Sequence, residues 1–133
     1  MSTTETILAA VASALAGVAD GHVYRSRREQ LETLPAVIVL PESADGAEDV
    51  IGVEDGTLVV AVEVYAKGDT PDTAADATLS AIWSALCAAP NLGLGSDVDL
   101  IRRRRVDWDF EDYDHVRATL HVSYLYRTAT GAM

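Results

Sequence analysis

The C-terminal third of this chain constrains its fold most, because residues 98 to 127 read as one long β-hairpin. The first strand of that hairpin carries four consecutive arginines, Arg102 to Arg105. Successive side chains of a strand point to opposite faces, so Arg102 and Arg104 point one way and Arg103 and Arg105 the other. One pair must share the face of the apolar side chains of this strand, which are Val98, Leu100, Val106 and Trp108. A charge cannot sit unpaired in a core, so we expect carboxylate partners in the same chain or on a neighbouring copy.

The composition predicts a single folded domain over residues 1 to 133. Hydrophobic residues make up 49% of the chain and charged residues 23%, a balance that supports one core. The formal net charge of −11 opposes binding to nucleic acid unless a local basic patch overrides it. Cys87 is the only cysteine, so we expect no disulfide framework. No apolar run approaches the length of a membrane span, so no membrane partner is expected.

The N-terminal segment predicts a helix and then a buried strand. Ser2 and Glu5 have the spacing of a capping box, and apolar residues recur at helical spacing after them. The helix is expected from about residue 3 to 19, with a stop at Gly21. Residues 22 to 25 predict a short strand, and the apolar run 36 to 40 is typical of a strand buried on both faces.

The middle of the chain predicts an exposed loop, a turn and a second helix. The acidic stretch Glu42 to Asp49 is expected to form the loop, followed by a short strand over 50 to 53. A turn is expected over 54 to 56 and a long strand over 57 to 66. Thr70 and Pro71 open a helix that ends before Pro90.

The order of these elements predicts an α+β domain. We expect a mostly antiparallel sheet of about four to five strands with two helices packed on one face. The opposite face carries polar and charged residues, so it should be wet or covered by a partner. The hairpin turn is expected over residues 111 to 114, and residues 128 to 133 should form a disordered tail.

No constellation of residues indicates catalysis. Residues 107 to 114 contain five acids, a composition that calcium sites use, but an EF-hand-like loop needs glycine where Asp112 stands. We therefore favour an acidic hairpin end that balances the arginines, and expect no metal. The three histidines lack a partner at zinc-ligand spacing, and neither a nucleophile motif nor a phosphate-binding loop is present. We expect no catalytic residues and no cofactor. Acids on both sides of the arginine run favour ion pairs across the hairpin or between subunits over a nucleic-acid face.

Several local patterns, together with the length and the order of elements, point to a known family. They are the Tyr24-Arg25 segment leading into Leu34 to Val37, the helix after Thr70 to Asp72, the Leu92 to Gly95 segment, and the ending Val122 to Thr128. In these features, which cover nearly the whole chain, it resembles the small tail-terminator, or tail-completion, proteins of long-tailed bacteriophages, of the minor tail protein U type.

The resemblance implies a structural role and no enzymatic activity. Such proteins form a hexameric ring on the head-proximal end of the tail tube, stop its polymerisation and present a surface to the head–tail connector. The implied partners are other copies of the chain, the tail tube protein and the connector, while DNA passes through without specific binding. The implied location is the virion of a phage or prophage, after assembly in the host cytoplasm.

In such a ring we expect certain residues at subunit contacts and others facing the tube or connector. The expected contact residues are Arg102, Arg104, Glu63 and Trp108. The expected tube- or connector-facing residues, in two loop segments, are Glu42, Asp45, Glu48, Asp49, Lys67 and Asp69.

Two other functions remain open at this point. One is a different neck or head-completion protein of a phage, whose partner would be the portal or an adaptor in place of the tail tube. The other is a small ligand-binding α+β domain or an enzyme, which would need a pocket with convergent polar groups.

Overall fold

The protein folds into a twisted five-stranded sheet with both helices on one face. We describe it from a computed structural model, which covers residues 2–25, 34–112 and 114–129. The strands are β1 (Val23–Arg25), β2 (Ala36–Val50), β3 (Val53–Lys67), β4 (Val98–Asp112) and β5 (His115–Ala129), in the spatial order β1-β2-β3-β5-β4. The helices are α1 (Thr3–Ala14) and α2 (Pro71–Ala88), with a short 3₁₀ helix η1 (Val18–Gly21). The predicted α+β class is confirmed. β1 pairs with β2 in parallel, and the other strand pairs of the described residues are antiparallel.

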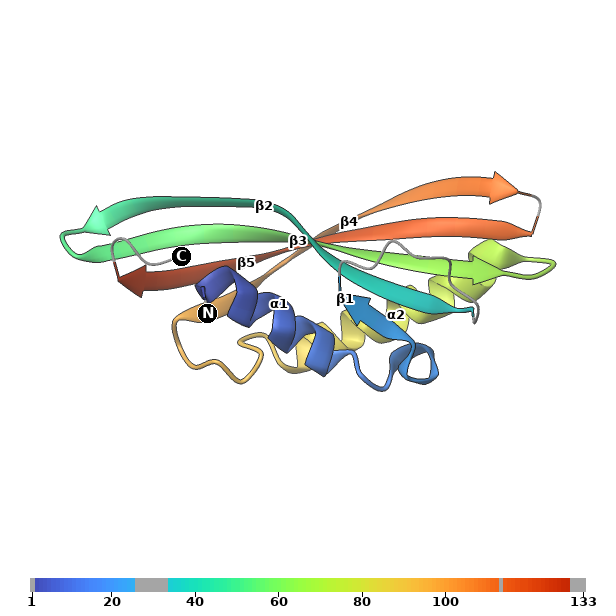
Figure 1. Cartoon of the computed structure of the whole chain (residues 1–133), viewed down its shortest axis with the longest axis horizontal. Coiled ribbons are helices and arrows are strands. Elements are labelled where there is room, and N and C mark those ends of the chain that lie inside the picture. Colours follow the sequence, from blue (N-terminus) through green and yellow to red (C-terminus); the bar gives the residue numbers. More distant parts are fainter. Residues whose placement is uncertain (1, 26–33, 113, 130–133) are drawn as a thin grey trace.

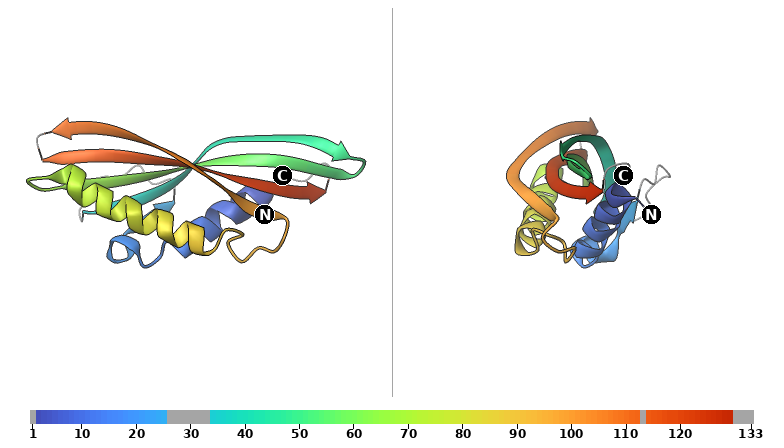
Figure 2. Two further views of the ribbon diagram at one scale, coloured as in Figure 1. Left: turned by 180° about the vertical axis from the view of Figure 1, so that it is seen from behind. Right: turned by 90° about the vertical axis from the view of Figure 1, so that its left-hand side faces the viewer.

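Two long hairpins point to opposite ends of an elongated molecule (Figure 1). β2 and β3 form one hairpin, while β4 and β5 form the other, which confirms the hairpin predicted from the arginine strand. β3 and β5 pair along their full lengths, from Val53 opposite Ala129 to Lys67 opposite His115. Both turns therefore lie beyond the ends of this central pair. Seen along the long axis, the sheet is strongly twisted and the helices lie to one side of it (Figure 2).

The first helix begins as the capping pattern predicts but is shorter than expected. The Ser2 side chain accepts a hydrogen bond from the Glu5 backbone N–H at 3.1 Å. Helix α1 ends at Ala14, and η1 follows, with Gly21 at a φ of +86°. The apolar periodicity continues through Val18, which explains why sequence alone extended the helix across this break. The Glu5 carboxylate reaches Arg25 in β1 at 3.0 Å and so ties the helix to the sheet.

The first long hairpin corrects the predicted loop and turn. Residues 42 to 49 do not form a loop, because β2 continues through them in register with β3, with irregularities near Pro41 and Glu48. The turn lies at Ile51 and Gly52 instead of residues 54 to 56. Gly52 has a φ of +86°, a conformation that glycine adopts without the steric cost of a side chain. The acidic composition suggested a loop here. Residues 42 to 47 are exposed, so they can form a strand without the alternation of apolar and polar residues that marks a half-buried strand.

The core lies between the helices and one face of the sheet. Alternate residues of β5 from Val116 to Tyr126 are buried. They belong to one core cluster with the apolar faces of the two helices, which include Ile7 of α1 and Ile82 of α2. A smaller apolar cluster of Ile38, Leu40 and Ala61 lies on the opposite face. The predicted burial of residues 36 to 40 on both faces is therefore confirmed.

The end of the chain is more ordered than the predicted tail. β5 continues through Ala129, and the Thr3 hydroxyl donates to the Thr128 hydroxyl at 3.2 Å. Residues 130–133 lie outside the described part of the chain. No helix in the described ranges is long and apolar enough to cross a membrane.

Candidate assembly surface

The arginine run forms a bulge on an edge strand. The register passes from Ile101 opposite Ser123 to Arg105 opposite His121, so Arg102 to Arg104 oppose the single residue Val122. All four arginine side chains are exposed. One arginine pair was expected to share the apolar face of this strand and to need carboxylate partners there. The side chains are instead exposed to solvent, because β4 is the sheet edge and carries a bulge.

Arg104 and Trp108, two of the predicted contact residues, lie together beside α2. The Arg104 guanidinium carbon is 4.9 Å from the centre of the Trp83 ring, which is the geometry of a cation–π contact. A groove of about 420 Å³ runs here between α2 and β4 and includes Trp83, Arg104 and Trp108. Arg104 thus has an aromatic partner where a carboxylate was expected. Trp108 is 42% exposed, although its strand neighbours Val98 and Leu100 are buried.

A second groove of about 670 Å³ lies on the sheet face that the helices leave open. We call it the arginine groove. Its lining residues come from four strands: Glu42, Ser43, Val59, Ile101, Arg103, Arg104, Arg105, His121 and Ser123. Neither Arg102 nor Arg103 forms an ion pair or hydrogen bond with another described residue. The groove therefore combines apolar side chains with three guanidinium groups, of which that of Arg103 has no partner among the described residues.

A chain of polar side chains links three strands in this groove. His121 Nδ1 lies 2.8 Å from Glu42 Oε2, and His121 Nε2 lies 2.8 Å from Asp107 Oδ2. Arg105 Nη2 donates to the same Asp107 oxygen at 3.0 Å. Partial desolvation raises the pKa of Asp107, but His121 and Arg105 together outweigh it and hold this pKa below its ordinary value.

Glu63, another predicted contact residue, lies in the central strand β3 and is only 9% exposed. The Tyr65 hydroxyl donates to Glu63 Oε1 at 3.2 Å. Desolvation and the charge of Glu63 raise the pKa of Tyr65. Farther along the same face, Arg117 Nη2 lies 2.7 Å from Asp109 Oδ2, which is an ion pair across the β4–β5 hairpin, although its arginine does not belong to the predicted run.

The outer part of the β2–β3 hairpin, from Ala44 to Leu58, is a second distinctive surface that we call the acidic arm. Residues 45 to 55 contain five acids and neither lysine nor arginine. Ile51 at the turn is 94% exposed. Asp55 accepts from Arg127 of β5, with oxygen–nitrogen distances of 2.7 and 3.2 Å, and this contact holds the arm against the sheet.

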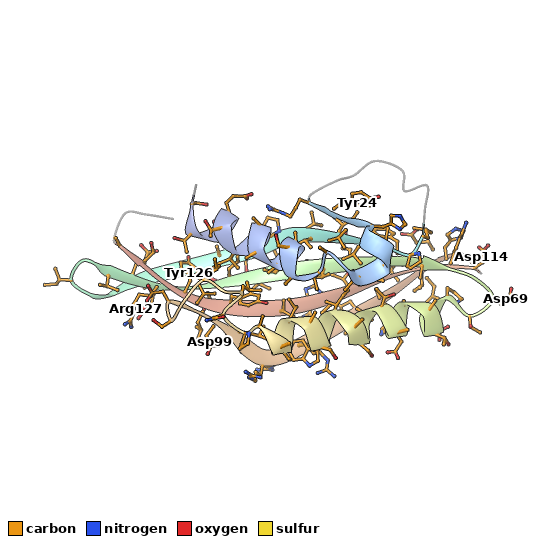
Figure 3. The ribbon with its side chains drawn as sticks, turned by 90° about the horizontal axis from the view of Figure 1, so that it is seen from below. Tyr24, Asp69, Asp99, Asp114, Tyr126 and Arg127 are labelled. Carbon is orange, nitrogen blue, oxygen red and sulfur yellow. The ribbon has the colours of Figure 1, made fainter. Side chains whose placement is uncertain are left out.

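The residues predicted to face the tube or connector do not gather on one surface. Glu42 and Asp45 belong to β2, while the side chains of Glu48 and Asp49 lie outside the described part. Lys67 ends β3 opposite His115, and Asp69 follows it, at the other end of the molecule. Figure 3 shows the same separation, with Asp69 and Asp114 at one end and Arg127 towards the other.

Sequence reasoning missed the contribution of His121 and the exposed Ile51. The only sequence signal for His121 was its place among the polar residues that alternate along β5. Its contacts with Glu42 and Asp107 require β2 and β4 to lie on the two sides of His121 at the right register. The sequence does not reveal the order of the strands or the bulge that sets the register of β4. Ile51 was missed because its segment was assigned to a strand before the turn.

Comparison with solved structures finds chains of similar fold. No protein-family model matches this chain, and no curated protein is similar to it in sequence. A chain from a solved structure, the virion of a native gene transfer agent particle, is similar with a TM-score of 0.64. The similarity covers 96% of this chain and 96% of that chain, at 19% sequence identity. The two chains share a fold.

Proposed function

We propose that this protein is a structural subunit of a phage or phage-like particle. The observation that carries the proposal is the shared fold with a chain of a gene transfer agent virion, over 96% of each chain. Within this class we propose the role of a tail terminator, which forms a ring on the tail tube, stops tube growth and offers a surface for joining the head. The order of elements and the local patterns shared with the tail-terminator family support this narrower role.

The distribution of polar groups supports assembly in preference to small-molecule chemistry. The arginine groove is rimmed by exposed side chains, whereas sites for small ligands usually bury most of the ligand surface. Two of its ionisable groups, His121 and Arg105, both contact Asp107, and His121 also contacts Glu42. The exposed Ile51, Phe110 and Leu125 are the kind of apolar contacts that a subunit boundary uses.

The proposed ring would consist of six copies, with no enzymatic activity. Its partners would be the tail tube protein on one side and the head–tail connector on the other, and DNA would pass through it. A net charge of −11 suits a passage that must not hold DNA. The protein would then reside at the head-proximal end of the tail.

Light scattering across a concentration series tests this function. A ring of six 14.2 kDa subunits has a mass near 85 kDa. That mass, together with capture of the protein by the ends of purified tail tubes, is the expected result. A protein that stays at 14.2 kDa and does not bind tube ends would overturn the proposal. Binding to the portal or its adaptor, without binding to tubes, would identify a neck protein instead.

A further inference from the structure

We propose that the acidic arm of one copy docks into the arginine groove of the next copy around the ring. This inference deepens the proposed function and rests on it, since it specifies how neighbouring subunits recognise each other. The two surfaces have opposite charge, belong to different parts of the molecule, and both include exposed side chains.

The groove offers cationic groups that need little rearrangement to receive an acidic segment. Arg103 is exposed and has neither an ion pair nor a hydrogen bond with the described residues. Arg104 is held over Trp83, and Arg105 is already shared with Asp107. The carboxylate inside the groove, Glu42, is bonded to His121, so it opposes an incoming acid less than a free carboxylate would. Arginine suits this use because its planar guanidinium binds carboxylates in a bidentate manner.

The arm offers the complementary pair of features, negative charge and an apolar tip. Its five acids lie on both sides of the turn in the sequence, and Ile51 lies at the turn itself with 94% of its surface exposed. In the arginine groove, Val59 and Ile101 provide apolar surface beside the guanidinium groups. An apolar anchor surrounded by polar contacts is the usual plan of an energetic centre in an interface.

The arm of a chain cannot reach its own groove. Val59 of the groove and Ile51 belong to the same hairpin, eight residues apart, which in paired strands is roughly 25 Å. The β2–β3 ladder holds this part of the chain extended. A contact between two different patches on identical chains is head-to-tail, and it closes into a ring when its rotation closes.

Charge exchange between the two surfaces tests the docking. The variants are Arg103→Glu in the groove and Asp45→Lys in the arm, with Lys67→Glu as a control that makes the same change of net charge as Arg103→Glu at the far end of the molecule. Like charges facing each other at a boundary oppose binding. Each of the first two variants alone is expected to remain at 14.2 kDa by light scattering where the wild type is assembled, while Lys67→Glu assembles normally.

An equimolar mixture of Arg103→Glu and Asp45→Lys is expected to regain the assembled mass. In an alternating ring the altered groove receives the altered arm, and the native groove receives the native arm. Recovery on mixing also demonstrates that both variants are folded. Replacement of Ile51 by serine is expected to weaken assembly in both the native and the mixed ring, because it removes the apolar anchor.

The outcomes separate the docking from the ring. A six-fold wild-type mass that neither charge variant changes would overturn the docking and leave the ring. A smaller wild-type assembly that is lost in each variant and restored by mixing would support the docking and contradict the ring. An unchanged mass in all variants, with binding of duplex DNA that only Arg103→Glu loses, would assign the groove to nucleic acid and overturn the docking.

Discussion

Tyr124 places a polar hydroxyl group in the apolar core. Its ring is completely buried between sheet and helices, and its hydroxyl has no hydrogen-bond partner among the described residues. Burial, with a smaller effect of the nearby Cys87, raises the pKa of Tyr124 far above its ordinary value, so the hydroxyl stays protonated. The ring therefore stabilises the core, whereas the hydroxyl carries a desolvation cost.

Removal of this hydroxyl should leave the protein as stable or make it more stable. We expect Tyr124→Phe to change the free energy of unfolding by between zero and about 1 kcal/mol in the stabilising direction. Tyr124→Ala should cost about 3 to 5 kcal/mol, because it leaves a cavity. Urea denaturation of both variants measures the difference. A Tyr124→Phe variant that loses more than about 1 kcal/mol would mean that the hydroxyl is hydrogen-bonded in solution.

The lowered pKa of Asp107 leads us to expect that the protein loses part of its folding stability in acid. The folded state holds the pKa of Asp107 below the ordinary value of 3.8, so the carboxylate stabilises the folded state above that value. The contribution is lost as the pH falls through the lowered pKa. We expect Asp107→Asn to be less stable than the wild type at pH 7 and to lose less stability than the wild type below about pH 4.

Thermal unfolding at a series of pH values measures this effect. Asp69→Asn is the matched control, because Asp69 is exposed in the turn before α2 and has no ion pair with a described residue. Parallel pH profiles for the wild type and Asp107→Asn would show that the contacts with His121 and Arg105 do not form in solution.

Among the elements, the β2–β3 hairpin depends on a single glycine at its turn. Gly52 and Gly17 both have open space around the position of a missing Cβ, but only Gly52 has a positive φ. The two glycines therefore differ in backbone conformation and not in crowding.

Gly52→Ala should destabilise the protein, and Gly17→Ala should not. We expect a cost of about 1 to 2 kcal/mol at Gly52, the penalty of the left-handed region for a residue with a Cβ. At Gly17, alanine lowers the conformational entropy of the unfolded state, so the substitution should leave the free energy of unfolding unchanged or raise it slightly. Urea denaturation compares the two. Equal effects of both substitutions would contradict the described turn.

Helices and strands with one buried face were predicted well from the sequence. The long hairpin over residues 98 to 127 and the helix that opens at Thr70 and Pro71 were both predicted correctly. Residues 42 to 49 were predicted as a loop because nothing buries them, yet pairing with β3 keeps them extended. The exposure of the arginines was not predicted, since the sequence does not show that their strand lies at the sheet edge and carries a bulge.

On the scale of the whole molecule, the two hairpin ends are expected to differ in their role. The turn at Gly52 ends the acidic arm, and the turn at Asp114 ends the β4–β5 hairpin on the opposite side. If the arm docks on a neighbouring copy, an insertion into the turn of the arm should disturb assembly, whereas an insertion into the turn of the β4–β5 hairpin should not.

Insertion of the same short Gly-Ser linker after Gly52 or after Asp114 tests this difference. Both insertions should leave the fold intact, because lengthening an exposed turn costs little free energy. We expect the first to prevent assembly and the second to permit it. Circular dichroism reports the fold and light scattering the mass. Assembly of both insertion variants, or of the Gly52 variant alone, would contradict an arm-mediated contact.

The continuous pairing of β3 with β5 also has a mechanical consequence. The turn of the β2–β3 hairpin precedes the start of β3, and the turn of the β4–β5 hairpin precedes the start of β5, at opposite ends of the same ladder. Hydrogen bonds of an antiparallel pair lie perpendicular to the strands. A force that pulls the two ends apart therefore loads these bonds in shear, all at once, and cannot open them one by one. Such a strand pair can transmit tension along the length of the subunit without unzipping.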